Sequence, residues 1–190
     1  MKHDVDAARF QPPEIRQRQI LDAAAILAVD RGLDDVSMAQ VAQQAGIAKG
    51  SLYLHYRSRA ELIDALRSDL WSKMLDEPTR IVVDDSITWT MRLDSIVRHL
   101  VRFSMTNEDL YHAVFHATAS QSDEPWTESR ELLRRLLEGG RTAGEFDITD
   151  LEITADFLLH AYAGPCYHSD DTERVADELI TLFRRTVGAD

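Results

Sequence analysis

Apolar residues recur at intervals of three and four along most of the chain, a spacing typical of helices with one buried face. In residues 14–31 small and aliphatic side chains carry this pattern, and Gly32 ends the segment. No stretch shows the strict alternation of a half-buried strand, and no internal repeat is present. The sequence therefore predicts an all-α fold of about nine helices.

Capping residues and breakers predict where the later helices begin and end. A long helix is expected over residues 58–77, before Pro78, with a loop over residues 78–85. Further helices are expected over residues 86–105, 107–119, 126–144 and 149–164, and from Asp171 onward. The tetrad Thr149-Asp150-Leu151-Glu152 is a capping box for one of them.

One stretch, residues 37–59, combines two short helical patterns around a tight turn. Ser37 is a natural N-cap for the first helix, and Gly46 can adopt the left-handed backbone conformation that a turn between crossed helices needs. After the turn, Leu52 faces inward, whereas the outward positions carry cations, hydroxyl groups and a bare backbone at Gly50. Such groups suit phosphate oxygens and base edges in a major groove. The pattern favours a helix-turn-helix; a hairpin packed inside an all-helical protein is the alternative.

The sequence AQQAGIAKGSLYLHYRSRAEL, with the amphipathic helix before it, resembles the DNA-binding domain of the TetR family of bacterial transcriptional regulators. The resemblance covers roughly residues 14–66 and includes the run Lys49-Gly50-Ser51-Leu52-Tyr53. Tyr56 stands where the family usually has phenylalanine, and Arg57 and Arg59 stand where lysines are common. The resemblance implies a homodimeric regulator, most often a repressor that a small-molecule effector releases from a palindromic operator in double-stranded DNA.

The residues expected to bind DNA lie at the start of the first reading helix and along the second. Contacts to phosphates are expected from Ser37, Lys49, Tyr53, His55 and Arg57, whereas Gly50 and Ser51 are expected closest to base edges. Tyr56 and Arg59 complete the predicted DNA-binding set.

The net charge of −12 is concentrated away from this segment. Residues 1–60 hold eight Lys and Arg against seven Asp and Glu, a balance of +1, whereas residues 61–190 hold thirteen against twenty-six, a balance of −13. An acidic body repels DNA, so only the N-terminal domain is suited to dock. The predicted domains are a flexible arm (1–13), a helix-turn-helix domain (14–57), a connecting helix (58–77) and a ligand-binding and dimerisation domain (78–190).

Composition limits the location and the chemistry. The longest apolar run is too short to span a bilayer, and the first 13 residues include Asp4, Asp6 and Arg9, where a secretory signal needs an apolar segment. The single cysteine, Cys166, excludes an internal disulfide framework and agrees with a reducing compartment. These features predict a cytoplasmic protein without a membrane partner.

Motifs typical of enzymes are missing. The sequence has no hydrolase elbow, phosphate-binding glycine loop or dinucleotide fingerprint. His112 and His116 have a spacing that can hold a metal ion, but nothing local supplies a third ligand. We expect no catalytic site, no metal and no cofactor.

The second domain is rich in aromatic residues and histidines, which line many ligand cavities but also form ordinary helix cores. Under the resemblance, the candidates for the effector cavity are His99, Phe103, Tyr111, Phe115, Trp126, Phe157 and His160. The sequence does not specify the effector, the operator or the regulated genes.

The last two expected helices are the candidates for the dimer interface. Small residues on one would permit close approach, and an apolar seam marks the other; these residues are Ala155, Ala161 and Gly164, and Leu179, Leu182 and Phe183. Two such helices and their symmetry mates would form a four-helix interface.

Two other functions also fit the sequence. A regulator of this kind can answer to a protein partner or a covalent change, and a helical adaptor could use the same hairpin to bind a protein. Salt-dependent binding to a palindromic duplex separates the adaptor from both regulators.

Overall fold

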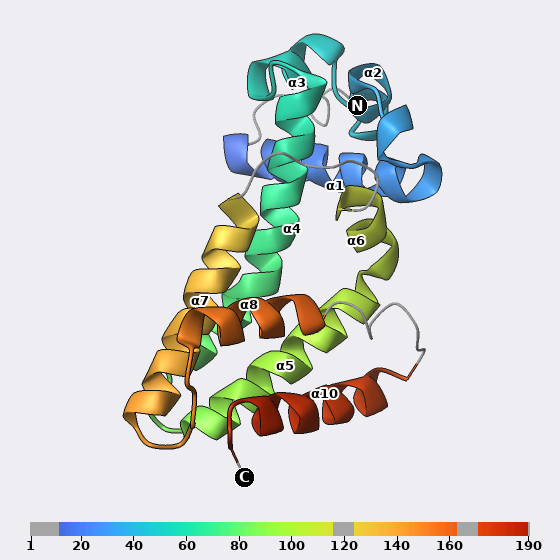
Figure 1. Ribbon diagram of the computed structural model, residues 1–190. Coiled ribbons are helices and arrows are strands. Elements are labelled where there is room, and N and C mark those ends of the chain that lie inside the picture. The colour runs from blue at the N-terminus through green and yellow to red at the C-terminus, as the bar shows by residue number, and fades with distance from the viewer. Residues whose placement is uncertain (1–11, 116–123, 163–170, 190) are drawn as a thin grey trace. The chain divides into compact units, whose positions relative to one another are not determined.

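The computed structural model describes residues 12–115, 124–162 and 171–189. Over these residues it contains nine α-helices, one 3₁₀ helix and no strand, which confirms the predicted all-α fold (Figure 1). The elements are α1 (Pro13–Arg31), η2 (Leu33–Asp35), α2 (Met38–Gln44), α3 (Lys49–His55), α4 (Arg59–Val82), α5 (Trp89–Thr106), α6 (Glu108–Phe115), α7 (Glu124–Thr142), α8 (Leu151–Ala161) and α10 (Thr172–Thr186). None of these described helices is long and apolar enough to cross a membrane.

The chain forms two compact units. The first comprises Met1–Asp69 and Asp109–Ala119, and the second comprises Leu70–Glu108 and Ser120–Asp190. This division differs from the predicted domains in two places, because the boundary falls inside α4 and because α6 from Asp109 onward joins the N-terminal unit.

Buried contacts explain why α6 belongs to the first unit. Tyr111 and Val114 on α6 are buried. The side chain of Arg67 on α4 is also buried, and its Nε donates a hydrogen bond to the carbonyl oxygen of Val114 at 3.2 Å. A spacing pattern along the chain does not reveal with which unit a short helix packs, so the prediction missed this arrangement.

The rest of the first-unit core comes from α1, η2, α2, α3 and the first turns of α4. Ile20, Leu33, Val41, Leu52 and Leu62 are almost fully inaccessible to solvent. Burial of each aliphatic side chain stabilises the fold by about 1.5–3 kcal/mol. The apolar face predicted for residues 14–31 is therefore confirmed, and Gly32 follows α1 with a positive φ of 82°.

Helix α4 runs through Pro78 to Val82 and is therefore longer than the sequence predicts. Proline lacks the N–H group that would bond to the carbonyl four residues earlier, here that of Met74. His99 on α5 replaces that donor, since its Nε2 lies 3.1 Å from the carbonyl oxygen of Met74. The last turn is held by the buried Val82, whose carbonyl oxygen accepts a hydrogen bond from Arg92 at 3.0 Å.

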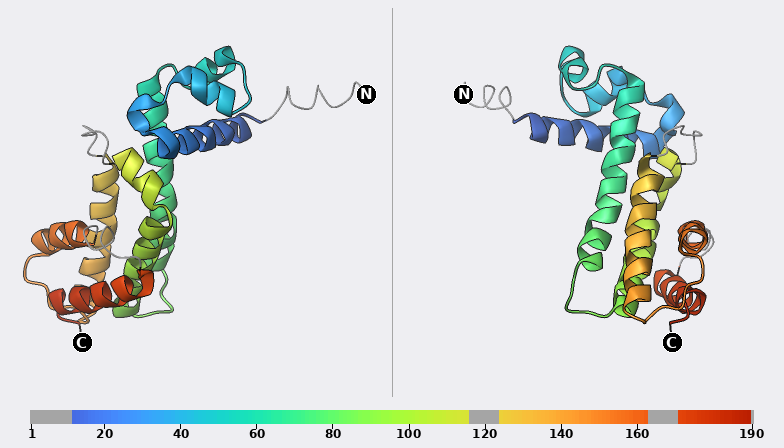
Figure 2. Two further views of the ribbon diagram at one scale, coloured as in Figure 1. Left: turned by 90° about the vertical axis from the view of Figure 1, so that its right-hand side faces the viewer. Right: turned by 60° about the vertical axis from the view of Figure 1, so that its left-hand side comes forward.

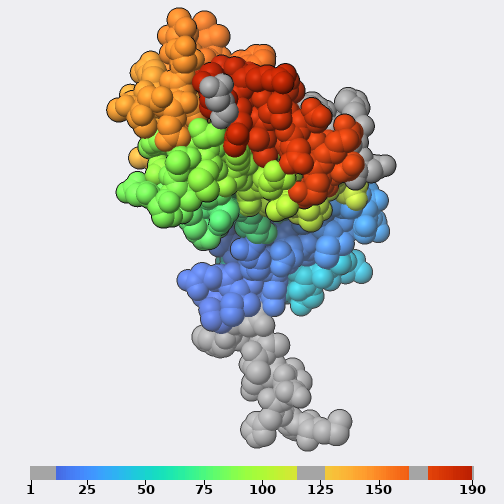
Figure 3. Space-filling model, turned by 90° about the horizontal axis from the view of Figure 1, so that it is seen from below, coloured from blue at the N-terminus to red at the C-terminus, as the bar shows by residue number. Residues whose placement is uncertain are grey.

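In the second unit, α10 packs along α5 and α8 packs along α7. Its core includes Leu93, Val101, Leu136, Leu137 and Leu158, all almost fully buried. Within this unit, α8 and α10 lie on the side of α7 away from α4 (Figure 2). The outer side of α10 is at the surface (Figure 3).

Two adjacent glycines in α7 allow aromatic rings to approach its backbone. A Cβ atom at Gly139 would lie 2.1 Å from Cη2 of Trp89, and a Cβ atom at Gly140 would lie 2.1 Å from Cδ2 of Phe146. Any larger residue at these positions would displace a ring from the core.

The segment after α7 also caps α5. Gly144 ends α7 with a φ of 75°, and the next residue, Glu145, accepts hydrogen bonds from the backbone nitrogens of Trp89 at 3.1 Å and Thr90 at 3.0 Å. These N–H groups belong to the first turn of α5 and have no partner within the helix. The carboxylate thus fixes the start of α5.

Candidate DNA-binding face and ligand cavity

The first reading helix, α2, begins with a reciprocal cap. The side chain of Ser37 accepts a hydrogen bond from the backbone nitrogen of Gln40 at 3.4 Å, and the Gln40 side chain accepts one from the Ser37 backbone nitrogen at 2.9 Å. This confirms Ser37 as the N-cap. The contact of Ser37 with a phosphate stays a prediction.

The turn between α2 and α3 is a Schellman motif centred on Gly46. Its φ is +66°, and its nitrogen donates to the carbonyl of Gln43 at 3.1 Å. The nitrogen of Ile47 donates to the carbonyl of Ala42 at 2.9 Å. These two bonds satisfy the last carbonyls of α2 and set the angle at which α3 leaves the turn.

The outer face of α3 is uncharged or basic. Lys49, Gly50, Tyr53 and Arg57 are exposed, and the Lys49 Nζ lies 6.0 Å from the centre of the Tyr53 ring. The predicted DNA-binding residues Ser51 and His55 are half-buried. Residues 37–59 contain three Lys and Arg and no Asp or Glu, although the whole chain carries −12.

Two residues of the predicted DNA-binding set make contacts within the chain: Tyr56 is buried and Arg59 is half-buried. Tyr56 is only 3% exposed, and burial raises the pKa of its hydroxyl group. The guanidinium of Arg59 donates to the carbonyl oxygens of Val36, at 2.7 Å, and Leu33, so it ties η2 to the start of α4. Both side chains thus have partners or packing within the chain, and their contact with DNA stays a prediction.

One exposed residue of α3 was missed by the sequence reasoning. Leu54 is 88% exposed and lies beside Tyr53 on the outer face. Its position two residues after the inward Leu52 was the available signal, since residues two apart in a helix point about 200° apart. A leucine methyl group can contact the methyl group of thymine in a major groove.

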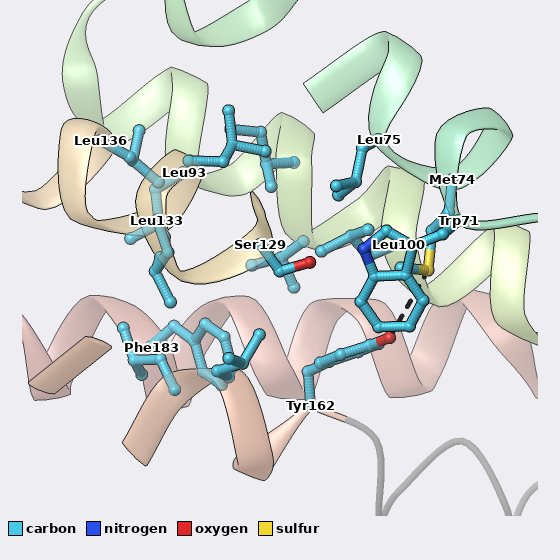
Figure 4. Close-up of a pocket in the computed structure, with 15 residues that line it drawn as sticks. Trp71, Met74, Leu75, Leu93, Leu100, Ser129, Leu133, Leu136, Tyr162 and Phe183 are labelled. Atoms are coloured by element: carbon cyan, nitrogen blue, oxygen red, sulfur yellow. Dashed lines mark hydrogen bonds between the residues drawn. The ribbon is translucent and has the colours of Figure 1, made fainter. Parts of the chain in front are cut away.

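The second unit contains an enclosed, almost wholly apolar cavity of about 50 Å³ (Figure 4). Its walls come from α4, α5, α7, α8, α10 and Tyr162, the residue after α8. Leucines dominate the lining, and Trp71, Met74, Tyr162 and Phe183 add larger groups. The hydroxyl group of Tyr162 donates to Sδ of Met74 at 3.7 Å.

The cavity holds one hydroxyl group that makes no hydrogen bond. Ser129 on α7 is only 6% exposed and lines the cavity, and its Oγ has no partner in the described part of the chain. Figure 4 shows this oxygen directed toward the Trp71 side of the cavity. Unpaired buried hydroxyl groups are rare in folded proteins.

None of the described effector candidates lines this cavity. His99 bonds to the Met74 carbonyl and stacks with Phe103 at 6.1 Å between ring centres. Tyr111 is buried in the first unit, Phe157 is 57% exposed, and the exposed His160 has its Nδ1 2.7 Å from the carbonyl oxygen of Asp156 in its own helix. The side chains of Phe115 and Trp126 lie outside the description.

The predicted dimer residues also divide between core and surface. Ala155, Leu179 and Phe183 are buried within the chain itself, so they are not free to meet a second copy. Ala161 is half-buried, Leu182 is 53% exposed, and Gly164 lies outside the described residues. Ile153 and Phe157 on α8 are 68% and 57% exposed, and we refer to these two residues together with the exposed Leu182 on α10 as the α8/α10 apolar face.

The described residues contain no group of three His, Cys, Asp or Glu side chains that could hold a metal ion. His112 lies on α6 within the described chain, whereas His116 and Cys166 lie outside it.

A helix-turn-helix with a basic reading face, in a chain whose second helical unit contains an enclosed cavity, defines a DNA-binding transcriptional regulator. The profile of the bacterial regulatory proteins, tetR family, matches residues 20–66. The HTH-type transcriptional repressor KstR2 of Rhodococcus jostii (strain RHA1) is 30% identical over 152 residues, which are 75% of this chain and 74% of the relative. The chain therefore belongs to the TetR family. Members of this family are transcriptional regulators and not enzymes. The family membership therefore confirms the resemblance seen in the sequence and the expectation that the chain is not an enzyme.

Solved structures share the fold. A bacterial regulatory protein in the tetR family from Rhodococcus RHA1 superposes with a TM-score of 0.75 at 22% identity, over 92% of this chain and 98% of that one. The fatty acid degradation regulator FadR from Bacillus halodurans has a TM-score of 0.80 at 16% identity, over 92% and 96%. At these identities the likeness concerns the fold alone.

Proposed function

We propose that the chain is a homodimeric repressor that binds a palindromic operator through α3 and leaves it when a small molecule occupies the second-unit cavity. The observation that carries this proposal is the exposure of Lys49 and Tyr53 on α3 and of Arg57 just after it, in a segment (37–59) without a carboxylate. The relative that is 30% identical is named as a repressor, which supports repression over activation.

On the DNA, each side chain has an expected partner. Lys49 and Arg57 bind phosphate oxygens as cations, and Tyr53, His55 and Ser37 do so through hydrogen bonds. Gly50 has no side chain and Ser51 has a short one, so the α3 backbone can come close to base edges there. Leu54 joins the proposed contact set as an apolar group for a thymine methyl.

Dimerisation follows from the size of the reading helix. α3 has seven residues and covers only a few base pairs, so useful specificity needs two copies that are about 34 Å apart, one turn of DNA. The α8/α10 apolar face, with Ile153, Phe157 and Leu182, is the surface we assign to this contact, in place of Leu179 and Phe183.

Release requires that the effector bind two arrangements of the dimer with different affinity. Helix α4 supports this coupling, since one uninterrupted helix contributes Leu62 and Leu66 to the first-unit core and Trp71, Met74 and Leu75 to the cavity wall. A shift of these wall residues is therefore covalently linked to the reading unit.

The proposal is tested by selection of operator DNA. Purified protein is mixed with sheared genomic DNA of its source bacterium, and the retained fragments are sequenced. We expect two inverted half-sites with centres about one turn apart and a Kd at least about 10³-fold tighter than that of a scrambled duplex. Equal affinity for both duplexes would refute sequence-specific regulation and favour the helical adaptor. Membership of the TetR family disfavours the adaptor.

The release step is tested once an effector is found. By reciprocity, the operator must lower effector affinity by the factor by which the effector lowers operator affinity. If the effector affinities with and without operator are equal, release by this effector is refuted. The favoured alternative is then a regulator that responds to a protein partner or a covalent change.

A further inference from the structure

The cavity of the second unit has a lining without charged side chains, which disfavours charged ligands. Its lining contains no Asp, Glu, Lys, Arg or His. A carboxylate or an ammonium group placed there would lose its water without gaining a counter-ion, which is strongly unfavourable. We infer that the effector is an uncharged, mainly aliphatic molecule with one hydrogen-bonding oxygen that pairs with the hydroxyl group of Ser129. This inference rests on the proposed function, which makes the cavity the effector site.

Ser129 and Ser104, on α5, are both buried and have a hydroxyl group without a partner in the described part of the chain, but only Ser129 lines the cavity. Thr154, Thr181 and Thr186 each donate to the carbonyl oxygen four residues earlier, at 2.6, 2.9 and 2.9 Å. Serine and threonine within helices commonly satisfy their hydroxyl groups in this way. Ser129 does not, although it is 6% exposed and water is excluded from much of its surroundings. A ligand oxygen would supply the missing bond.

The remaining polar groups of the wall are placed differently. The Tyr162 hydroxyl group already bonds to Met74, and both side chains lie on the α4 side of the cavity, opposite Leu133 and Leu136 (Figure 4). Most of the lining is leucine, isoleucine and valine. The indole nitrogen of Trp71 is a further polar atom of the wall. A lining with so few polar groups fits a ligand whose surface is mostly hydrocarbon.

A second hollow shows how a ligand could enter. An open groove between α4 and α7 shares Leu75 and Leu132 with the enclosed cavity. The two hollows therefore adjoin each other at these two side chains. The enclosed space of about 50 Å³ is small, so a ligand must push leucine side chains aside as it enters.

The groove also disfavours anions. Its lining contains the carboxylates of Asp76, Glu128 and Glu131 and one guanidinium, that of Arg135, a balance of −2. Glu131 is also paired with Arg134, which does not line the groove. Asp76 and Glu128 are therefore the carboxylates that oppose an anion there. A negatively charged ligand would be repelled on approach and stripped of water at the end. The uncharged cavity lining and the acidic groove beside it both disfavour an acidic effector.

The test uses three probes of equal chain length: octan-1-ol, octanoate and octan-1-amine. Isothermal titration calorimetry of the full chain measures each affinity without DNA. We expect octan-1-ol to bind, and the two charged probes to bind at least roughly tenfold more weakly. The inference is overturned if octanoate or octan-1-amine binds as tightly as octan-1-ol, or if octan-1-ol does not bind.

The Ser129→Ala variant tests the anchor. It should weaken octan-1-ol binding by about three- to tenfold, the range for one hydrogen bond, and leave octyl chloride, which lacks the hydroxyl group, unchanged. Because it deletes an unpaired buried hydroxyl group, the free variant should also melt at a higher temperature than the parent. The exposed Ser95→Ala serves as the matched control, with no change in binding. An unchanged octan-1-ol affinity in Ser129→Ala would overturn the assignment.

The two proposals fail in different ways. Suppose that octan-1-ol binds, that Ser129→Ala weakens this binding, and that octan-1-ol does not change the affinity for the operator. The cavity chemistry then stands and the release mechanism fails. If an acidic molecule proves to release the operator through this cavity, the release mechanism stands and the inference fails.

Discussion

His99 supplies the hydrogen bond that Pro78 cannot make. Its Nε2 lies 3.1 Å from the carbonyl oxygen of Met74, which in a continuous helix would accept from the residue at position 78. A histidine that the sequence suggested as a ligand contact is thus a structural partner of a proline on another helix. The pair keeps α4 regular beside the cavity wall.

This relationship predicts a specific coupling. His99→Leu leaves the Met74 carbonyl short of a donor and should lower the free energy of unfolding by about 1–3 kcal/mol. Pro78→Ala restores the backbone N–H, so the double variant should lose less than the sum of the two single variants. Urea unfolding of the four proteins measures the difference. Additive losses would show that the histidine stabilises the fold by other contacts.

The glycines of α7 and α3 should respond in opposite ways to the same substitution. Gly140→Ala places a Cβ atom 2.1 Å from the Phe146 ring and should destabilise the protein by about 1–3 kcal/mol, in spite of the better helix propensity of alanine. Gly50→Ala meets nothing within 4 Å and should keep or raise stability, yet weaken operator binding if α3 approaches the bases there. Urea unfolding and fluorescence anisotropy separate the two effects. If Gly50→Ala keeps the full operator affinity of the parent, the α3 backbone does not approach the bases at Gly50.

Lys49→Ala should change the salt dependence of DNA binding. Loss of one phosphate contact lowers the slope of log K against log salt by about 0.9 and weakens specific and random duplexes alike. Arg80→Ala removes the same charge from an exposed site in the last turn of α4 and is the matched control. If the two variants show equal slopes, Lys49 does not touch the backbone of the duplex.

Phe157→Glu should separate the dimer without unfolding the chain. Phe157 is 57% exposed in one copy, and a charge there would be buried in the interface at a cost of about 2 kcal/mol or more, roughly thirtyfold in Kd. Light scattering measures the mass, and circular dichroism checks the helices; Ile26→Glu, at a 49% exposed site on α1, is the control. Phe183→Glu should instead unfold the second unit. A dimer that survives Phe157→Glu would move the interface off α8.

Glu145 makes the free energy of unfolding depend on pH in the acidic range. Partial burial opposes its charged form, but hydrogen bonds from Thr90 and Trp89 prevail and hold the pKa of Glu145 below its usual 4.5. The stabilisation from this carboxylate is therefore fully present above about pH 4.5 and is lost as pH falls through the lower folded value. Glu145→Gln should lose stability in urea unfolding at pH 7, and the gap to the parent should narrow as pH falls below 4.5. Glu128→Gln, at an exposed site of α7, is the charge-matched control. A gap that does not change with pH would assign the loss to shape alone.

Local signals made the helix-turn-helix predictable. Ser37, Gly46 and Leu52 act through neighbours within a few residues, so their positions in the sequence already contain the geometry. Pro78 was misread because its effect is offset by His99, which lies 21 positions further along the chain. Local pattern cannot report such a distant compensation.

The cavity could not be predicted for a related reason. The sequence reasoning selected aromatic residues and histidines by type, but a cavity is defined by which helix faces meet. Phe157 faces outward, whereas Leu75, Leu132 and Leu136 line the cavity. Each of these residues belongs to an apolar pattern with intervals of three and four, so the pattern does not distinguish them. Which apolar face meets which other is decided by long-range packing of α4, α5, α7, α8 and α10.

The uneven distribution of charge has a consequence for what happens after release. A repressor that leaves its operator faces a genome in which random sequence vastly outnumbers specific sites. Residues 37–59 hold three cations and no carboxylate, but residues 61–190 carry −13, so we expect random duplex to attract the chain only weakly. Released protein would therefore partition into the free pool and not onto neighbouring DNA. Derepression would then depend on the effector concentration and little on how much competing DNA the cell contains.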